Sequence, residues 1–228
     1  MFCYIDVETI PDQREGAKDR ISQSIKHPAQ MKKPETIQNW IDTKKDSAIE
    51  EEWLKTSFDG GYGELISCSF AAGDGEIINH HRNLGESEPD LIDKVFEAIR
   101  CINPKIPPYF VGHNIPFDLK FLHHRAIVLG VNPGFKLPFD GRHGKDYFDN
   151  MQEWAGYRDR ISQDNLCKIL GIEGKPDDID GSKVWEFVRA GKIKRVAEYN
   201  DDDVNKVRQI YHKLNYCITR SIVNLKLN

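Results

Sequence analysis

The spacing of apolar residues along the chain changes several times, and each change predicts an element. The first stretch is apolar and carries aromatic and β-branched side chains, which is typical of a short buried strand. Two further apolar runs flank Gly73-Asp74-Gly75 and predict a hairpin, because such a turn readily supplies a positive φ. The expected strands cover residues 1–7, 64–72, 76–81 and 108–111, with another strand end at 146–149.

Four segments carry apolar residues at the spacing of a helix that buries one face. Pro89 and Pro116 suit the first turns of two of these helices, and Gly130 ends the second one. Asp164 is expected to cap the third helix, which Gly171 ends. The expected helices begin at residue 89, run from 116 to 129 and from 164 to 170, and extend from about 194 to beyond 214.

A polar stretch at residues 12–58 interrupts this alternation. Its centre, at residues 26–45, is rich in lysine, and its apolar residues are scattered. We expect one or two amphipathic helices and a loop there, inserted into the main fold; the lysines could clamp a single-stranded substrate or bind a partner. The rest of the chain, a strand, a hairpin and then alternating helices and strands, predicts an α/β fold with a mixed sheet. We expect a single domain over residues 1–228.

Composition favours a globular protein of ordinary kind. Of the 228 residues, 39% are hydrophobic, which is enough to build a full core at this length. The formal net charge of −4 argues against a protein that coats long nucleic acids by bulk electrostatics. A protein that binds a few nucleotides with a local basic rim is still compatible with this charge. Five widely spaced cysteines without a CxxC pair predict free thiols in a reducing cytoplasm. No run has the length and apolar character of a membrane span, so we expect a soluble protein.

Two carboxylates lie at the end of the first predicted strand. In Asp6-Val7-Glu8, the two-residue period of a strand puts both acids on one face and Val7 on the other. An acid-x-acid triplet arises often by chance, and a solvated strand end explains it when it is read alone. The carboxyl end of a central strand, however, is where α/β sheets place their ligands.

A second motif joins the predicted strand at 108–111 to the helix that begins at Pro116. Asp118 falls in the first turn of that helix, on the same rim of the sheet as Asp6 and Glu8. Helix capping is an equal alternative for Asp118, because acids are favoured near a helix N-terminus by about 0.3–1 kcal/mol.

The third motif, Tyr199-Asn200-Asp201-Asp202-Asp203, lies on the last predicted helix. Residues four apart share one face of a helix, so we expect Tyr199 and Asp203 to face a common site while Asp201 points elsewhere. Asp201 and Asp202 are expected to form a solvated acidic face. The apolar residues that follow should hold Asp203 against the core.

Together the three motifs predict a metal site. Four carboxylates at one sheet edge cannot all stay ionised without cations, because each negative charge raises the pKa of its neighbours. Oxygen ligands without histidine or cysteine suit Mg²⁺ or Mn²⁺. Two such ions can generate a hydroxide, polarise a phosphodiester and stabilise the departing 3′-oxygen. The expected chemistry is therefore phosphodiester hydrolysis.

These motifs resemble those of the DnaQ-like 3′–5′ exonuclease superfamily in its DEDDy branch, and within it stand-alone proteins related to the exonuclease domain of family-B DNA polymerases. The resemblance rests on YIDVET, VGHNIPFDLKFL and YNDDDV, in that order, and on the stretch at 164–204. It covers roughly residues 1–10 and 60–215 and leaves 12–58 unexplained. It implies an RNase H-like fold and an enzyme that releases nucleoside 5′-monophosphates from 3′ ends.

The resemblance also implies roles for the motif residues. Asp118 would support the second metal ion, and Tyr199 would orient the attacking water, because its ordinary pKa near 10 makes it a poor base at neutral pH. Phe117 is also a candidate core residue. The implied metal ligands are Asp6, Glu8, Asp118 and Asp203, and the implied contacts to the terminal nucleotide are Thr9, His113, Asn114 and Phe117.

One position departs from the pattern of the family. Relatives often carry cysteine after the motif tyrosine, where this chain has Asn200. We expect residue 200 to face away from the metal ions, so that the change has little effect.

The expected partner is the 3′ end of single-stranded DNA, with a polymerase or another replication or repair protein as a further candidate. An RNA-directed 3′–5′ exonuclease is an alternative, because discrimination between the sugars depends on how tightly the pocket fits a 2′-hydroxyl. A non-catalytic nucleic-acid-binding module of the same fold is another alternative, and its expected mark is a missing carboxylate.

Overall fold

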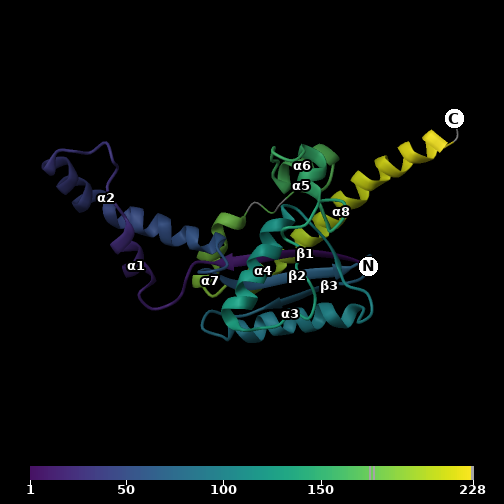
Figure 1. Cartoon of the computed structure of the whole chain (residues 1–228), viewed down its shortest axis with the longest axis horizontal. Helices are drawn as coiled ribbons and strands as arrows, with labels where there is room; N and C mark the ends of the chain where they lie inside the picture. Colours follow the sequence, from purple (N-terminus) through teal and green to yellow (C-terminus); the bar gives the residue numbers. More distant parts are fainter. Residues whose placement is uncertain (175, 177, 227–228) are drawn as a thin grey trace.

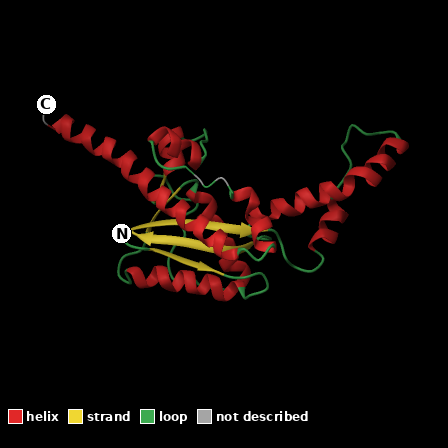
Figure 2. Cartoon of the chain, turned by 180° about the vertical axis from the view of Figure 1, so that it is seen from behind, coloured by secondary structure: helices red, strands yellow, loops and turns green. Residues whose placement is uncertain are grey.

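The structure, a computed structural model, describes residues 1–174, 176 and 178–226, with side chains up to Asn215. Its centre is a five-stranded sheet in the order β3-β2-β1-β4-β5 (Figure 1 and Figure 2). β1 runs antiparallel to β2 and parallel to β4, so the predicted α/β fold with a mixed sheet is confirmed. The strands are β1 Phe2–Ile10, β2 Glu64–Ala72, β3 Ile77–His81, β4 Tyr109–Gly112 and β5 Tyr147–Asp149.

The central strand β1 is longer than its apolar pattern predicts. It continues to Ile10 because β2 pairs with it throughout, up to Ile10 opposite Glu64. On its other side, β4 pairs only with the first part of β1, from Phe2 to Tyr4. The second half of β1 therefore lies beyond the end of β4, at the carboxyl ends of the parallel strands.

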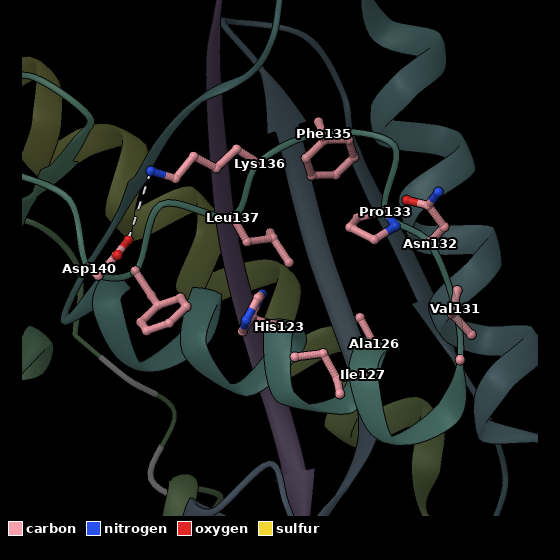
Figure 3. A pocket seen from close by; sticks show the side chains of 12 residues that line it. His123, Ala126, Ile127, Val131, Asn132, Pro133, Phe135, Lys136, Leu137 and Asp140 are labelled. Carbon is pink, nitrogen blue, oxygen red and sulfur yellow. Dashed lines mark ion pairs between the residues drawn. The ribbon is translucent and has the colours of Figure 1, made fainter.

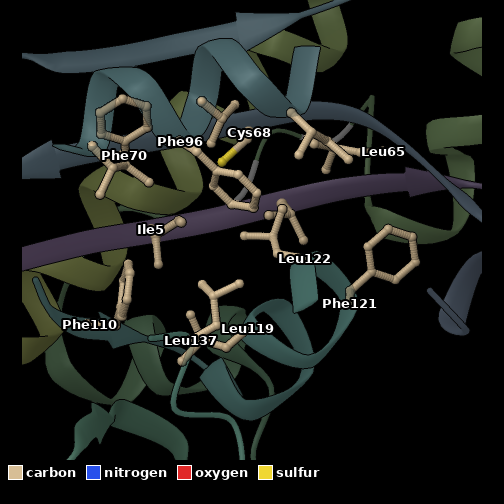
Figure 4. Close-up of a cluster of buried hydrophobic side chains, with 14 of the residues drawn as sticks. Ile5, Leu65, Cys68, Phe70, Phe96, Phe110, Leu119, Phe121, Leu122 and Leu137 are labelled. Carbon is tan, nitrogen blue, oxygen red and sulfur yellow. The ribbon is translucent and has the colours of Figure 1, made fainter. Parts of the chain in front are cut away.

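Helices cover both faces of the sheet. Odd-numbered residues of β1 such as Ile5 pack with α3 and α4 in the main hydrophobic core, which includes Phe96 and Leu122 (Figure 4). Tyr4 points to the opposite face, where it packs with Val207 of α8. The helices of the body are α3 Glu88–Ile102, α4 Ile115–Leu129, α5 Asn150–Ala155, α6 Gln163–Leu170, α7 Val184–Arg189 and α8 Ile193–Lys226.

The predicted long helices are confirmed, whereas the predicted cap of α6 is wrong. α6 begins one residue before Asp164, and Ser162 is its cap, since Ser162 Oγ accepts a hydrogen bond from the backbone N–H of Asn165. Gly171 ends this helix with φ +63°, as predicted. The sequence pattern missed α5 and α7, because six residues are too few to show a helical period.

Residues 12–58 form an arm that projects from the body of the protein (Figure 1 and Figure 2). It contains α1 Ala17–Ser24, α2 Pro34–Lys55 and a 3-10 turn, η1 Thr56–Phe58, so the expectation of helices and a loop is confirmed. The expectation that they are amphipathic is wrong for α2 as a whole. Trp53 is the only buried residue of α2, so most of the helix is surrounded by solvent.

Two of the bulk properties expected from composition can be compared with the structure. Cys3, Cys68, Cys101 and Cys167 are free thiols, and Cys217 lies beyond the described side chains. Within the described part of the chain, no helix combines the length and the apolar character that crossing a membrane requires.

Candidate active site

Three carboxylates from two elements meet on the α8 face of β1. Asp6 and Glu8 share this face because they are two residues apart on a strand, and α8 brings Asp203 to them. One carboxylate oxygen from each residue lies within 4.8 Å of the other two. Glu8 and Asp203 are buried and Asp6 is half-buried. This all-oxygen set, assembled from positions almost 200 residues apart in the chain, fits a hard divalent cation.

Packing of α8 sets the position of Asp203. The next residue, Val204, and Val207 one turn later are fully buried against β1 and β4. One turn before Asp203, the Tyr199 hydroxyl donates a hydrogen bond to the Asp203 carboxylate. Burial, and then the negative charges of Asp203 and Glu8, raise the pKa of Tyr199 far above its ordinary value. Tyr199 therefore keeps its proton and can orient a neighbouring group by hydrogen bonding.

Asp118 lies beside the cluster of three carboxylates and is not part of it. Where the pairing with β4 has ended, the Asp118 carboxylate accepts a hydrogen bond from the backbone N–H of Val7. Burial, and then the negative charge of Asp6, hold the pKa of Asp118 well above its usual range. The structure thus brings Asp118 within electrostatic reach of Asp6, while the three-residue set could hold an ion without it.

A further buried acid near Asp118, Asp149, is missing from the sequence motifs. Its carboxylate accepts hydrogen bonds from the backbone N–H groups of Asn114 and Met151, both at 2.9 Å. Burial raises the pKa of Asp149, although these hydrogen bonds oppose the shift. Asp149 holds the strand–helix corner that carries Asp118. The sequence contained one indication of Asp149, namely the strand end expected at 146–149. That strand end lies at the same edge of the sheet as the motif acids.

The structure contradicts the expectation that residue 200 faces away from the site. Asn200 is fully buried, and its Nδ2 donates a hydrogen bond to Asp6 Oδ2 at 2.7 Å. Its Oδ1 lies 2.9 Å from the hydroxyls of both Ser67 and Ser69 on β2. Asn79 of β3 donates to these two hydroxyls in turn. Through this one amide side chain, Asp6 is therefore connected to β2 and, by way of the serine hydroxyls, to β3.

The expected solvated face of α8 is only partly present. Asp201 is half-buried and accepts a hydrogen bond from Ser69 Oγ at 2.7 Å. Asp202 forms an ion pair with Lys206, whose side chain is almost completely buried. Both acids thus have hydrogen-bonding or ionic partners while keeping some contact with solvent, and neither belongs to the three-residue cluster.

The four residues expected to contact a terminal nucleotide differ in their contacts and in their exposure to solvent. Thr9 Oγ1 donates to the Ser57 carbonyl at 2.7 Å, and His113 Nε2 lies 2.8 Å from the Ile161 carbonyl oxygen. Asn114 is exposed and has φ +62°, the left-handed conformation that asparagine tolerates better than most residues. Of the four residues in this group, it presents the most exposed side chain.

Phe117 takes part in both the core and a surface cleft. It is half-buried against the main core, and its ring also lies edge-on to Phe58, with centroids 6.4 Å apart. Phe58 belongs to the arm and is 70% exposed, so the motifs of the main fold did not point to it. The two rings border a cleft of about 330 Å³, which is lined by Phe58, Asp59, Gly60, Phe117, Lys120, Phe121 and His124.

A larger cavity, of about 520 Å³, lies between the second half of α4 and the loop at 130–140 (Figure 3). Its lining is mainly apolar, and its one acidic lining residue, Asp140, lies 4.0 Å from the ammonium of Lys136. Because a hard cation needs several oxygen ligands, this cavity does not suit a metal ion. The carboxylate cluster on β1 and α8 is therefore the candidate active site.

Comparison with known proteins agrees with this assignment. Residues 62–222 match a family described as a predicted 3′–5′ exonuclease related to the exonuclease domain of PolB. This match includes Tyr199 and Asp203, while Asp6 and Glu8 precede it. No curated protein matches the chain significantly.

A similar solved structure shares the fold. It is the family B DNA polymerase from the hyperthermophilic archaeon Pyrobaculum calidifontis, with a TM-score of 0.54 and 19% sequence identity. The similarity covers 68% of this chain and 22% of the polymerase, so the chain corresponds to a small part of that protein. At this level of identity the similarity shows the fold.

Proposed function

This chain belongs to the family of predicted 3′–5′ exonucleases related to the exonuclease domain of PolB, and we propose that it is a metal-dependent 3′–5′ exonuclease acting on single-stranded DNA ends. One observation carries the proposal. Asp6, Glu8 and Asp203 form a cluster that can hold a divalent ion, at the carboxyl end of the central strand. The complete set of motif carboxylates also favours catalysis over a non-catalytic module of the same fold.

In the proposed site, Asp6, Glu8 and Asp203 hold one Mg²⁺ or Mn²⁺ ion, and Asp118 with Asp6 supports a second. Bound divalent ions supply an activated water and neutralise the charge that develops on the phosphate. Tyr199 keeps its hydroxyl proton, and this hydroxyl, held by Asp203, orients the attacking water. Asn200 fixes the direction of one Asp6 oxygen.

The terminal nucleotide is proposed to lie against Thr9, His113, Asn114 and Phe117. The exposed ring of Phe58 adds an aromatic surface beside Phe117, and bases of any sequence can stack on such a ring. This surface supports a single-stranded nucleic acid as the substrate, and single-stranded DNA is the form that we propose. The free thiols fit a reducing compartment, and we propose the cytoplasm. We further propose one domain over residues 1–228, acting alone or beside a polymerase or another replication or repair protein.

The test is the degradation of an end-labelled single-stranded DNA in Mg²⁺, in Mn²⁺ and in EDTA. We expect stepwise release of nucleoside 5′-monophosphates with either metal and none in EDTA. Asp203→Asn should abolish the release. Glu198→Gln, which removes one exposed carboxylate from the same helix outside the cluster, should retain it. The same activity in wild type and Asp203→Asn, or full activity in EDTA, would refute the proposal. A matched RNA in parallel determines the sugar preference.

A further inference from the structure

We propose that the arm, residues 12–58, is a second nucleic-acid contact whose tip, residues 26–45, binds the phosphodiester backbone of the strand that enters the active site. This inference rests on the proposed function, because it needs a strand whose 3′ end occupies the carboxylate cluster. It assigns a role to the one segment that the family resemblance leaves unexplained.

The base of the arm is fixed to the body beside the active site. The arm leaves β1 after Ile10 and returns to β2 at Glu64, and these two residues pair with each other. The buried Asp12 accepts hydrogen bonds from Arg14 and Arg20, and its carbonyl accepts one from Trp53 Nε1 at 2.8 Å. Such a base holds the arm in a defined direction instead of letting it swing freely.

A second set of contacts joins the base to the candidate site and to α7. The Trp53 ring packs edge-on against Trp185 of α7, with centroids 5.4 Å apart. Thr9, the residue after the metal-site Glu8, donates its hydroxyl to the Ser57 carbonyl at the end of the arm. The arm therefore begins four residues after Glu8, and its last turn is hydrogen-bonded to the residue beside the carboxylate cluster. A strand that leaves the site on this side would meet the arm first.

Charge is distributed unevenly along the arm. At the base, Lys18 pairs with Glu50 and Lys55 with Glu52, so the charges compensate each other. At the tip, the lysines outnumber the acids, and within the described structure none of these lysines forms an ion pair. The tip lysines are Lys26, Lys32, Lys33, Lys44 and Lys45, and the tip acids are Glu35 and Asp42. The tip is therefore positive in a chain whose formal net charge is −4.

The outer half of α2 separates this charge onto one side. Trp40 and Lys44 are four residues apart and share a face with Ile37, whereas Glu35 and Asp42 lie on the opposite face. Lys44 is exposed and Trp40 is half-buried. A face that combines ammonium groups with an aromatic ring suits a polymer of phosphates and bases, since lysines contact the backbone and rings stack on bases. An acidic or purely apolar protein partner would not use both.

The direction and length of the arm fit a strand rather than a single nucleotide. The arm extends from the end of the sheet at which β1 terminates (Figure 1 and Figure 2). α2 has 22 residues, which corresponds to a length of about 33 Å. A single strand must be several nucleotides long to cover this distance, because each nucleotide spans only a few ångströms of the backbone. A substrate of a few nucleotides should therefore miss the tip, whereas a longer one should reach it.

The experiment compares two variants with the same loss of positive charge. The tip variant is K26Q/K32Q/K33Q/K44Q, and the control is K94Q/K105Q/K136Q/K145Q, with all eight lysines exposed. In the cleavage-deficient Asp203→Asn background, binding of labelled single-stranded DNA of about 4 and about 20 nucleotides is measured by fluorescence anisotropy over a range of salt concentrations. Thermal unfolding checks that each variant folds, and exposed changes of this kind should cost little.

We expect the tip variant to lose at least about 10-fold in affinity for the long DNA and little for the short one, with a salt slope lower by about 0.7 for each lost phosphate contact. The control should bind both as the parent does. Equal affinity of parent and tip variant for the long DNA would overturn the proposal. The arm would then serve only a protein partner. If the wild-type protein with Mg²⁺ or Mn²⁺ releases no nucleotide from either DNA, the proposed function fails independently of the arm.

Discussion

Asn200 Nδ2 donates a hydrogen bond to Asp6 Oδ2 at 2.7 Å, and this contact links a buried amide to a carboxylate of the candidate metal site. The direction of the amide follows from its neighbours. Asn79 donates to the Ser67 hydroxyl, which leaves that hydroxyl free to donate to Asn200 Oδ1, and the carboxylate of Asp6 can only accept. The amide nitrogen must therefore face Asp6, and one oxygen of Asp6 is held in place.

Removing this amide should weaken the metal site. Asn200→Ala is expected to lower the affinity for Mn²⁺ by about 10–100-fold, the usual effect of losing a group that orients a metal ligand, with a parallel fall in turnover. Isothermal titration calorimetry of the folded variant measures the affinity directly. Asn205→Ala, on the same helix with its side chain hydrogen-bonded to Arg208, is the control. An unchanged Mn²⁺ affinity in Asn200→Ala would show that the amide serves folding alone.

Tyr199→Phe should separate turnover from metal binding. The change removes only the hydroxyl that donates to Asp203, while the ring stays in its buried position. We expect a fall in kcat of about 10-fold or more, consistent with the loss of a group that orients a reactant, and an Mn²⁺ affinity close to that of wild type. Steady-state kinetics and calorimetry on the same preparation give both values. If kcat does not change, Tyr199 has no part in the reaction.

Divalent metal should stabilise the protein, and Asp118 should contribute to the effect. Ligand binding to the folded state alone stabilises it by about 2.7 kcal/mol at 100 times Kd. Because burial raises the pKa of Asp118, ionising it is costly until a cation compensates its charge. Asp118→Asn retains an oxygen acceptor for the Val7 N–H but cannot become an anion. The variant should melt near the metal-free wild type and gain less Tm from Mn²⁺; an equal gain would exclude Asp118 from metal binding.

The base of the arm should respond to acid. Burial of Asp12 opposes its ionisation, but the hydrogen bonds from Arg14 and Arg20 outweigh burial and lower the pKa of Asp12 below its ordinary value. A carboxyl group with a lowered folded-state pKa stabilises the fold above its unfolded pKa of about 3.9, and this contribution disappears as the pH falls through the folded-state value.

Asp12→Asn should therefore cost about 1–2 kcal/mol at pH 7, a value kept small because Arg14 and Arg20 are half-exposed, and almost nothing near pH 2. Urea unfolding followed by tryptophan fluorescence at the two pH values measures the difference. The same cost at both pH values would mean that the charge of Asp12 is not what stabilises the arm.

Phe58→Ala should leave the fold intact but weaken the binding of DNA. The ring is 70% exposed, so its loss should change the stability by no more than about 0.5 kcal/mol. If a base stacks on it beside Phe117, the variant should lose about 1–3 kcal/mol of binding free energy for single-stranded DNA. Ile127→Ala, an exposed apolar residue farther along α4, is the control. Wild-type affinity in Phe58→Ala would show that this ring takes no part in binding DNA.

Local patterns in the sequence determined the elements and the principal acids of the site. The two-residue period of β1 placed Asp6 and Glu8 on one face, and the four-residue spacing on α8 placed Tyr199 beside Asp203. Both predictions depend on backbone geometry alone, which is the same in any strand or helix. The mixed sheet could be predicted for a related reason, because the order of strands and helices along the chain restricts how they can pack.

Tertiary structure alone decided which neighbours those acids have. Asn200 reaches Asp6 only because β2 places two serine hydroxyls behind its amide, more than 130 residues away in the chain. Asp118 stands beside the cluster because β4 ends early and exposes the Val7 N–H. Strand lengths and the contacts between distant side chains follow from packing across the whole core, and no periodic pattern in a single segment carries that information.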